Sequence, residues 1–211
     1  MTDLFSLRDK TIVISGAAGI LGSQYARACL DAGANVVLLE VNADNLATLT
    51  EDLVKDHDPT RIYSTVCDCS IENDITSAFA GARAQFDHID VVVNNATAPI
   101  DTPQAFFAPL TELSLDEWRR QNSVNFDGCF LMAKAAVTAF LDKPSPSGSL
   151  VQISSIMGVM GHDKRIYEGA LYEGNSINTP VPYAAAKAGV LGLMRWIAVE
   201  YADQGIRSNA I

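Results

Sequence analysis

The stretch Gly16-Ala17-Ala18-Gly19-Ile20-Leu21-Gly22 follows the short β-branched run 11–14 and precedes a helical pattern over 23–32. Glycines in such a turn permit a tight bend, let the backbone approach a pyrophosphate, and let the helix pack closely on the strand. Free N–H groups at the start of the helix then favour the phosphate charge. This stretch therefore predicts a strand-turn-helix unit that binds a nucleotide.

The rest of the chain alternates short apolar runs with longer helical patterns. Continuous apolar strands separated by helices are typical of a parallel sheet buried between two helical layers. Right-handed crossovers turn this order into a doubly wound parallel sheet, the Rossmann arrangement. We therefore predict an α/β fold and a single domain over 1–211. The predicted strands are 11–14, 35–39, 62–66, 89–93 and 149–153, and the predicted helices are 23–32, a helix with Leu46, Leu49 and Leu53, 71–86, 115–140 and 183–202.

The composition excludes several classes of function. With 48% hydrophobic and 19% charged residues, the chain resembles a globular protein rather than a disordered one. The 15 Lys and Arg against 25 Asp and Glu give a net charge of −10. Duplex nucleic acid and anionic membranes favour proteins with basic patches, so we expect neither as a partner. No apolar run reaches about 18 residues, and the start at Met1-Thr2-Asp3 lacks the pattern of a secretory signal. We expect a cytoplasmic protein that acts on a small molecule.

The four cysteines fit a reducing compartment. Cys29 and Cys129 lie in apolar helical patterns, while Cys67 and Cys69 form a C-x-C pair at a strand end. No second pair and no His cluster completes a zinc site, and a disulfide framework is typical of smaller secreted chains. We interpret all four as reduced thiols that pack as small hydrophobic groups, with no metal site. Metal binding by the C-x-C pair is the alternative.

An acidic residue ends the second predicted strand. Glu40 lies 18 residues after Gly22, close to the spacing of a carboxylate that holds the adenosine ribose hydroxyls of a dinucleotide. A carboxylate there repels a 2′-phosphate, and no Arg or Lys lies between Ser15 and Gly22 or directly after Glu40. The sequence therefore favours NAD over NADP. An ordinary solvated acid at the strand end is the alternative for Glu40.

Three further places carry groups suited to catalysis. Tyr183 and Lys187 are four residues apart at the start of a helix, so their side chains share one face. An ammonium near a phenol lowers its pKa from about 10 toward neutrality, which makes the tyrosine a usable general acid and base. Ser155 ends a strand at the sheet edge where such folds bind ligands, and Asn125 lies within a long helix. Taken singly, packing or solvation explains most occurrences of these patterns.

In their order along the chain, these motifs resemble the short-chain dehydrogenase/reductase family, from about residue 10 to 211. The stretch 16–22 resembles the family's cofactor turn, and 33–40 resembles its second strand with the terminal acid. Asp68 falls where the family has an Asp near the adenine, and Asn94-Asn95-Ala96 resembles its N-N-A-G motif. The resemblance implies cofactor contacts from Gly16, Gly19, Ile20, Leu21, Gly22, Glu40, Asp68, Asn94, Ala96, Tyr183 and Lys187.

The same resemblance implies a catalytic tetrad of Asn125, Ser155, Tyr183 and Lys187. In the family's pattern, Tyr183 would exchange a proton with the substrate oxygen, and Ser155 would steady that oxygen. Lys187 would bind the nicotinamide ribose and tune Tyr183. Asn125 would hold a water in a proton relay.

The chain departs from the family pattern in its turns. Gly19 comes three residues after Gly16, and Ile20 occupies the usual place of the middle glycine. This G-x-x-G-x-x-G spacing is more typical of the family's extended branch, whose members often act on nucleotide sugars. Thr97 replaces the glycine of N-N-A-G, so we expect the local turn to differ.

A longer departure separates two members of the tetrad. Ser155 and Tyr183 are 28 residues apart, where the family usually has a much shorter spacing. The intervening stretch 157–182 is irregular and resembles a bacterial subgroup of oxidoreductases of surface-sugar or flagellin-glycan pathways. One interpretation places it over the active site, where its Tyr and acidic groups hydrogen-bond a polyol. The other has it pack on the domain or on a neighbouring subunit.

The family continues beyond Asn209-Ala210-Ile211 with a substrate-covering segment and a last strand, so we expect a truncated chain that lacks its C-terminal strand. The leading hypothesis is an NAD-dependent oxidoreductase, a homodimer or homotetramer at full length. It would interconvert a secondary alcohol and a ketone on a small substrate, with sugar-like compounds among the candidates. The alternatives are a nucleotide-sugar dehydratase or epimerase that recycles NAD, and a non-catalytic NAD-binding sensor or scaffold.

Overall fold

The computed structural model describes residues 4–211, and within them six parallel strands form one central sheet. Their order is β3-β2-β1-β4-β5-β8, so the chain builds outward from β1 to one edge and then crosses to build the other half. This topology confirms the predicted doubly wound Rossmann fold. The strands are β1 (Thr11–Ser15), β2 (Asn35–Glu40), β3 (Ile62–Val66), β4 (Val91–Asn94), β5 (Gly148–Gln152) and β8 (Ile206–Ala210).

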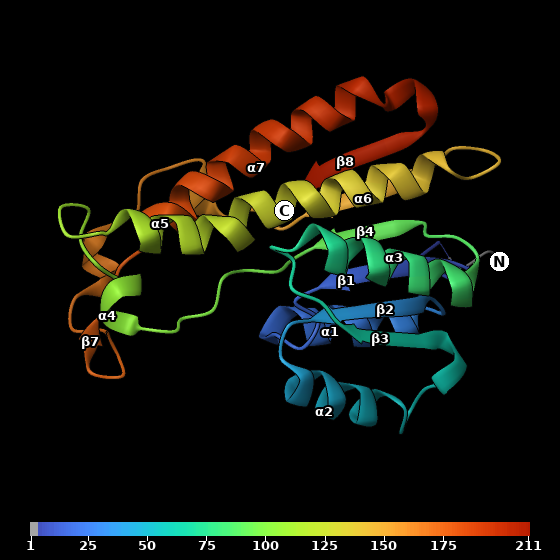
Figure 1. The fold of residues 1–211 in the computed structure, drawn as a ribbon, viewed down its shortest axis with the longest axis horizontal. Coiled ribbons are helices and arrows are strands. Elements are labelled where there is room, and N and C mark those ends of the chain that lie inside the picture. Colours follow the sequence, from blue (N-terminus) through green and yellow to red (C-terminus); the bar gives the residue numbers. More distant parts are fainter. Residues whose placement is uncertain (1–3) are drawn as a thin grey trace.

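Helices cover both faces of the sheet because alternate side chains of each strand point to opposite faces. Val13 of β1 joins the core under α3 (Glu72–Phe86) and α6 (Cys129–Leu141). Its neighbours Ile12 and Ile14 join a second core under two other helices. Figure 1 shows these layers around β1, β2 and β4. The helices of the second core are α1 (Ile20–Asp31) and α2 (Ala43–Leu53).

The helix predicted over 115–140 is interrupted. It consists of α5 (Leu115–Asn122), a π-helical turn at Ser123–Gly128, and α6, which run in line in Figure 1. Asn125 lies in this π turn, where its side chain accepts hydrogen bonds from the loop after β4. Periodicity does not reveal such a turn because an apolar pattern continues through it.

The same stretch, Leu115–Leu141, is apolar and long enough to cross a membrane by length and composition alone. Half of its most apolar window is buried in the described structure, with a mean hydropathy of 1.3. This segment packs against the sheet and α3, as a core helix does. The expected lack of a secretory signal at Met1-Thr2-Asp3 lies outside the described residues.

The irregular stretch 157–182 contains two 3₁₀ turns and a small hairpin. The hairpin joins β6 (Leu171–Tyr172) to β7 (Asn175–Ser176) through Glu173 and Gly174, which have φ angles of +49° and +79°. Figure 1 shows β7 beside α4 (Pro103–Phe106), beyond the sheet. The Tyr172 and Phe107 rings lie 6.2 Å apart, so this insertion packs on the segment that follows β4.

The last helix and strand complete the described sheet. α7 (Val181–Glu200) begins two residues before the predicted start and packs along β8 and α5. β8 pairs in parallel with β5 and forms the outer edge of the sheet within residues 4–211. That the chain lacks the family's last strand stays a prediction.

Candidate active site

The glycine-rich turn joins β1 to α1 in a bend that requires glycine. Gly16 has a φ of +62°, and a Cβ there would lie 3.0 Å from the Ala96 Cα. A Cβ on Gly22 would lie only 2.2 Å from the Gly16 carbonyl oxygen. Among the described residues no side chain caps the start of α1, and its first turn carries no acidic group. The N–H groups at this end are therefore open to an anion.

Ile20 stands where the family has its middle glycine, and it does not close the turn. Its side chain is 90% exposed at the first position of α1, and the next residue, Leu21, is 52% exposed. Both line the cavity described below. Ile20 therefore offers an apolar surface at the mouth of the turn.

Glu40 ends β2 beside the glycine-rich turn. Its Oε2 accepts a hydrogen bond from the Ala18 N–H at 3.2 Å, and its Oε1 accepts one from the Asn42 N–H at 3.1 Å. These two backbone donors fix the plane of the carboxylate. Each oxygen keeps a further lone pair for a ligand hydroxyl.

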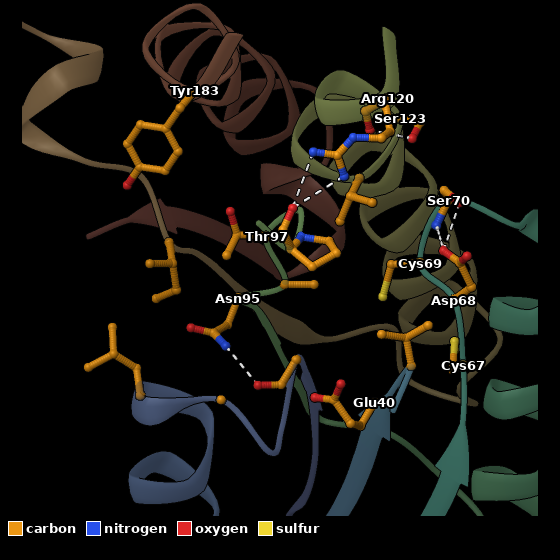
Figure 2. Close-up of a pocket in the computed structure, with 18 of the residues that line it drawn as sticks. Glu40, Cys67, Asp68, Cys69, Ser70, Asn95, Thr97, Arg120, Ser123 and Tyr183 are labelled. Atoms are coloured by element: carbon orange, nitrogen blue, oxygen red, sulfur yellow. Dashed lines mark hydrogen bonds between the residues drawn. The ribbon is translucent and has the colours of Figure 1, made fainter. Parts of the chain in front are cut away.

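A cavity of about 710 Å³ connects this carboxylate with the start of α7. Figure 2 shows Glu40 and Tyr183 on opposite sides of it, with Asn95 and Thr97 between them. The volume is in the range of cofactor pockets, and the cavity lies at the carboxyl ends of the strands, where doubly wound sheets bind ligands. The predicted residues that line it are Gly16, Gly19, Ile20, Leu21, Glu40, Asp68, Ala96, Tyr183 and Lys187.

The residues that follow β3 form a third wall of the cavity. Asp68 lines this wall, and its Oδ1 accepts hydrogen bonds from the N–H and hydroxyl of Ser70, at 2.8 and 2.7 Å. Cys67 and Cys69 flank it as buried free thiols that also line the cavity. The hydrogen bond from Cys69 lowers the pKa of the Cys67 thiol, and the same bond raises that of Cys69. Residues 4–211 hold no group of three or more Cys, His, Asp or Glu that could bind a metal.

The two adjacent asparagines at the end of β4, Asn94 in the strand and Asn95 directly after it, have different surroundings. Asn94, the predicted cofactor contact, is buried outside the cavity lining and donates to the Cys129 carbonyl at 2.9 Å. Asn95, absent from the predicted set, lines the cavity and donates to the Ser15 and Gly16 carbonyls at 3.0 and 3.2 Å. It therefore ties this loop to the glycine-rich turn. Sequence spacing alone does not show which of the two adjacent asparagines makes this contact.

Asn125 lies just behind the cavity wall. Its Oδ1 accepts hydrogen bonds from the Thr97 hydroxyl at 2.9 Å and from the Ala98 N–H at 2.8 Å. Its side chain is 3% exposed, and its Nδ2 has no hydrogen-bond partner among the described residues. A buried amide donor without a protein partner is explained by strain, by a catalytic role, or by a bound water or ion.

Lys187 and Tyr183 meet at the opposite end from Glu40. The Lys187 Nζ lies 5.4 Å from the centroid of the Tyr183 ring and donates to the Ile153 carbonyl at 2.5 Å. Burial lowers the pKa of this ammonium, because a charge in a site only 5% exposed loses its hydration. The two side chains are thus neighbours in the cavity, as their four-residue spacing predicts.

Ser155 stands at the end of β5 but does not line the cavity. Its hydroxyl oxygen accepts a hydrogen bond from the Met157 N–H at 3.1 Å and caps a short 3₁₀ turn (Ile156–Gly158). Of the predicted set, Gly22, Asn94 and Asn125 also lie outside the lining. Gly22 contributes through the close packing of α1, and Asn125 through the loop after β4.

A buried polar cluster lies behind Lys187 and was not predicted. The Cys129 thiol donates to the Gln152 Oε1 at 2.8 Å, and Asn94 donates to the Cys129 sulfur at 3.1 Å. Burial raises the pKa of Cys129 to about 12, although the nearby Lys187 charge opposes this. The thiol therefore stays neutral and joins α6 to the ends of β4 and β5.

Arg120 is another cavity residue, and no sequence motif indicates it. Its guanidinium donates to both Glu117 oxygens at 2.8 Å and to Asp101 at 2.9 Å. Arg120 and Lys187 are the basic residues among the described residues that line the cavity. Arg120 is paired with two acids, so it carries no uncompensated positive charge toward a ligand.

These features fit a nicotinamide dinucleotide. The glycine-rich turn leaves a cradle that a Cβ would fill, the start of α1 is uncapped, and a held carboxylate stands beside it. A phosphate fits the first two features, and ribose hydroxyls fit the third. Tyr183 and Lys187 would then adjoin the nicotinamide half of the bound molecule.

Comparison with known proteins agrees with this geometry. Residues 10–211 match the family model described as short chain dehydrogenase. The chain is 34% identical over 206 residues to the short chain dehydrogenase/reductase dpchG of Colletotrichum higginsianum (strain IMI 349063), covering 97% of this chain and 68% of that protein. It is 34% identical over 205 residues to the cis-4-hydroxycyclohexanecarboxylate dehydrogenase of Sinomonas cyclohexanicum, covering 96% and 72%.

A solved structure shows the same fold. The crystal structure of levodione reductase has a TM-score of 0.79 with 27% sequence identity, and the match covers 96% of this chain and 70% of that chain. The chain therefore belongs to the short-chain dehydrogenase/reductase family, whose members are oxidoreductases that act on CH–OH groups with NAD(H) or NADP(H).

Proposed function

We propose that this protein is an NAD-dependent dehydrogenase that interconverts a secondary alcohol and a ketone on a small substrate. One observation carries the proposal. A single cavity has the held carboxylate of Glu40 on one side and the Tyr183–Lys187 pair on the other. The first end suits an adenosine ribose, and the second suits proton exchange with an oxygen beside the nicotinamide.

The preference for NAD rests on charge. Glu40 is fixed by two backbone N–H groups and cannot turn away from a ribose without losing both hydrogen bonds. A 2′-phosphate beside it would meet a negative charge without a compensating cation, because Arg120 is engaged by Glu117 and Asp101. NAD instead offers two hydroxyl donors to the same carboxylate.

The protein's part in the reaction is positioning and proton exchange. The cofactor, when bound, accepts or supplies the hydride. We assign to Tyr183 the exchange of the proton with the substrate oxygen, taken in oxidation and returned in reduction. Ser155 would donate a hydrogen bond to that oxygen, and Lys187 would hold the nicotinamide ribose beside Tyr183. Asn125 would hold a water with its unpartnered amide N–H.

Two kinds of observation support a substrate class. One relative given above is named for cis-4-hydroxycyclohexanecarboxylate, and the solved structure given above is named for levodione. The insertion 157–182 lines no part of the cofactor cavity among the described residues, and it brings Tyr167, Glu168 and Asn178 to a separate hollow. We propose small cyclic alcohols and polyols as the substrate class.

A coupled screen tests the proposal. The purified protein is incubated with NAD or NADP and cis-4-hydroxycyclohexanecarboxylate, a set of polyols, or nucleotide sugars, and in reverse with NADH and levodione. We expect a change in absorbance at 340 nm with NAD and at least one alcohol. Product formed from a nucleotide sugar without a net change in this absorbance would favour an epimerase or dehydratase. Cofactor binding without any turnover would favour a sensor or scaffold.

We also propose a homodimer or homotetramer in the cytoplasm. Large apolar side chains are exposed on neighbouring helices, namely Phe130 on α6 and Trp196 and Val199 on α7. An apolar surface of this kind supports association between copies. All four cysteines are free, which supports a reducing compartment. Light scattering after size exclusion should give the mass of a dimer or tetramer, and a monomer at micromolar concentrations would contradict this.

A further inference from the structure

Thr97 occupies the position where the family's N-N-A-G motif has a glycine, and its hydroxyl makes a specific contact. The Thr97 Oγ1 donates to the Asn125 Oδ1 at 2.9 Å, joining the loop after β4 to the π turn between α5 and α6. A glycine supplies no side-chain donor here. This contact therefore belongs to this chain rather than to the general motif.

The direction of the hydrogen bond follows from its neighbours. The Ala98 N–H can only donate, and it donates to the Asn125 Oδ1 at 2.8 Å. The opposite orientation of the amide would place its NH₂ group against this N–H. The carbonyl oxygen accepts only, so the Thr97 hydroxyl must donate to it.

Two donors thus hold one side of the Asn125 amide, and its NH₂ group points the other way. This group is a buried donor without a partner among the described residues, in a residue only 3% exposed. Asn125 lies in a π turn, where the backbone lacks the regular α-helical bonding that would otherwise stiffen it. The β-branched Thr97 has few side-chain rotamers, so it adds a rigid second anchor.

We propose that Thr97 is a positioning residue, which holds the Asn125 amide with its NH₂ group aimed inward for the proton relay. This inference rests on the proposed function for the role of Asn125, although the hydrogen bond itself does not. Thr97 also lines the cofactor cavity, so the side chain that positions Asn125 is in reach of whatever binds there. Because Thr97→Val keeps the shape of this part of the cavity wall, it should act on turnover through Asn125 and change cofactor binding little.

The test compares Thr97→Val, which removes the hydroxyl at nearly constant shape, with Thr97→Ser, which keeps it. Thr48→Val is the matched control, because its hydroxyl bonds the Asp44 carbonyl on the exposed face of α2. In protein labelled with ¹⁵N-asparagine, the Asn125 NH₂ signals are identified by their loss in Asn125→Asp. We expect their hydrogen exchange to accelerate about 2- to 10-fold in Thr97→Val, as the loss of one hydrogen bond predicts, and to recover in Thr97→Ser.

Turnover is the second readout. With any alcohol of the screen that is oxidised, Thr97→Val should lower kcat by a similar factor, leave the KM for NAD unchanged, and be rescued by Thr97→Ser. Unchanged exchange in Thr97→Val overturns the proposal, and so does faster exchange with unchanged kcat. If no alcohol is oxidised, the exchange result alone decides. Tyr183→Phe separates the two claims. Normal turnover in Tyr183→Phe defeats the proposed function. Loss of turnover in Tyr183→Phe together with normal turnover in Thr97→Val defeats only this inference.

Discussion

The backbone N–H of Ala18 donates to the Glu40 Oε2 at 3.2 Å, although the two residues are 22 positions apart in the chain. β1 and β2 are paired in register through Ser15 and Leu39, so the turn after one strand meets the last residue of the other. The hydrogen bond therefore couples the predicted phosphate turn to the predicted ribose anchor. A change of charge at Glu40 should alter which cofactor binds without altering the sheet.

Glu40→Gln should reverse much of the preference for NAD. Glutamine keeps an oxygen for the Ala18 N–H but removes the negative charge. That charge repels a 2′-phosphate and strengthens the hydrogen bonds to ribose hydroxyls. We expect the ratio of the NADP Kd to the NAD Kd to fall about tenfold, as for the loss of a charged hydrogen bond. Titration of both cofactors by calorimetry measures this. Glu51→Gln, an exposed residue of α2, is the control, and an equal shift there would show a general charge effect.

Tyr183→Phe removes the proposed proton carrier while keeping the ring beside Lys187. Turnover should fall by about 10²- to 10⁴-fold, the usual contribution of a general acid or base. The Kd for NAD should change less than about threefold, because the phenol contributes little to overall cofactor binding. Tyr172→Phe on the β6–β7 hairpin is the matched control. Tyr183→Phe with nearly normal turnover would remove Tyr183 from the mechanism.

Asp90 lies at the opposite end of the sheet from the cavity and forms an ion pair with Lys143. Its Oδ1 accepts from the Lys143 Nζ at 2.8 Å, and its Oδ2 accepts from the Thr11 N–H at 3.0 Å. Burial raises the pKa of Asp90, but these two hydrogen bonds and the positive charges of Lys143 and Lys10 together outweigh that effect and hold the pKa below its ordinary value near 3.8. The ionised form is thus stabilised by folding.

The pH dependence follows from that direction. A carboxyl with a lowered pKa in the folded state adds stability above pH 3.8, and this contribution is lost as the pH falls through the lower folded value. Asp90→Asn should therefore lower the free energy of unfolding by about 1–3 kcal/mol at pH 7, and the deficit should shrink below pH 3.8. Urea unfolding at several pH values measures this. An equal deficit in Asp116→Asn, on the exposed start of α5, would contradict a specific role.

Arg61 closes the end of α1. Its guanidinium donates to the Leu30 carbonyl at 2.7 Å and to the Ala34 carbonyl at 2.5 Å, after the helix has ended at Asp31. Arg61→Met should lower the free energy of unfolding by about 1.5–3 kcal/mol, because its charged hydrogen bonds to the Leu30 and Ala34 carbonyls are lost. The Kd for NAD should stay unchanged. Arg195→Met on the exposed face of α7 gives the comparison, and equal unfolding midpoints for the two variants would refute the assignment.

Local patterns were sufficient for the order of strands and helices. The apolar runs and the glycine-rich turn report short-range requirements, namely burial, backbone freedom and hydrogen bonding within a few residues. The hairpin at Glu173 and Gly174 was missed, although a glycine at a two-residue turn between Tyr172 and Asn175 is a local signal for it. The interruption of the helix at Ser123–Gly128 left no such signal.

The candidate site was predictable as a set of motifs, and less so as a set of contacts. Spacing identified Glu40, Tyr183 and Lys187, which the fold gathers around one cavity. Spacing did not separate Asn94, which turns toward α6, from Asn95, which lines the cavity. Adjacent side chains along a strand point to opposite faces, so the side chains of Asn94 and Asn95 leave the end of β4 in different directions. Only the folded sheet shows which of these directions leads to the cavity.

The sequence by itself determined the fold, the family and the chemical identities of the site residues, because these depend on residue type and local spacing. Only the tertiary structure decided that Thr97 holds Asn125 and that Ala18 holds Glu40. Such hydrogen bonds join groups 22 to 28 positions apart and depend on distance and direction to a few tenths of an ångström. That precision is reached only when the strands, turns and helices pack together.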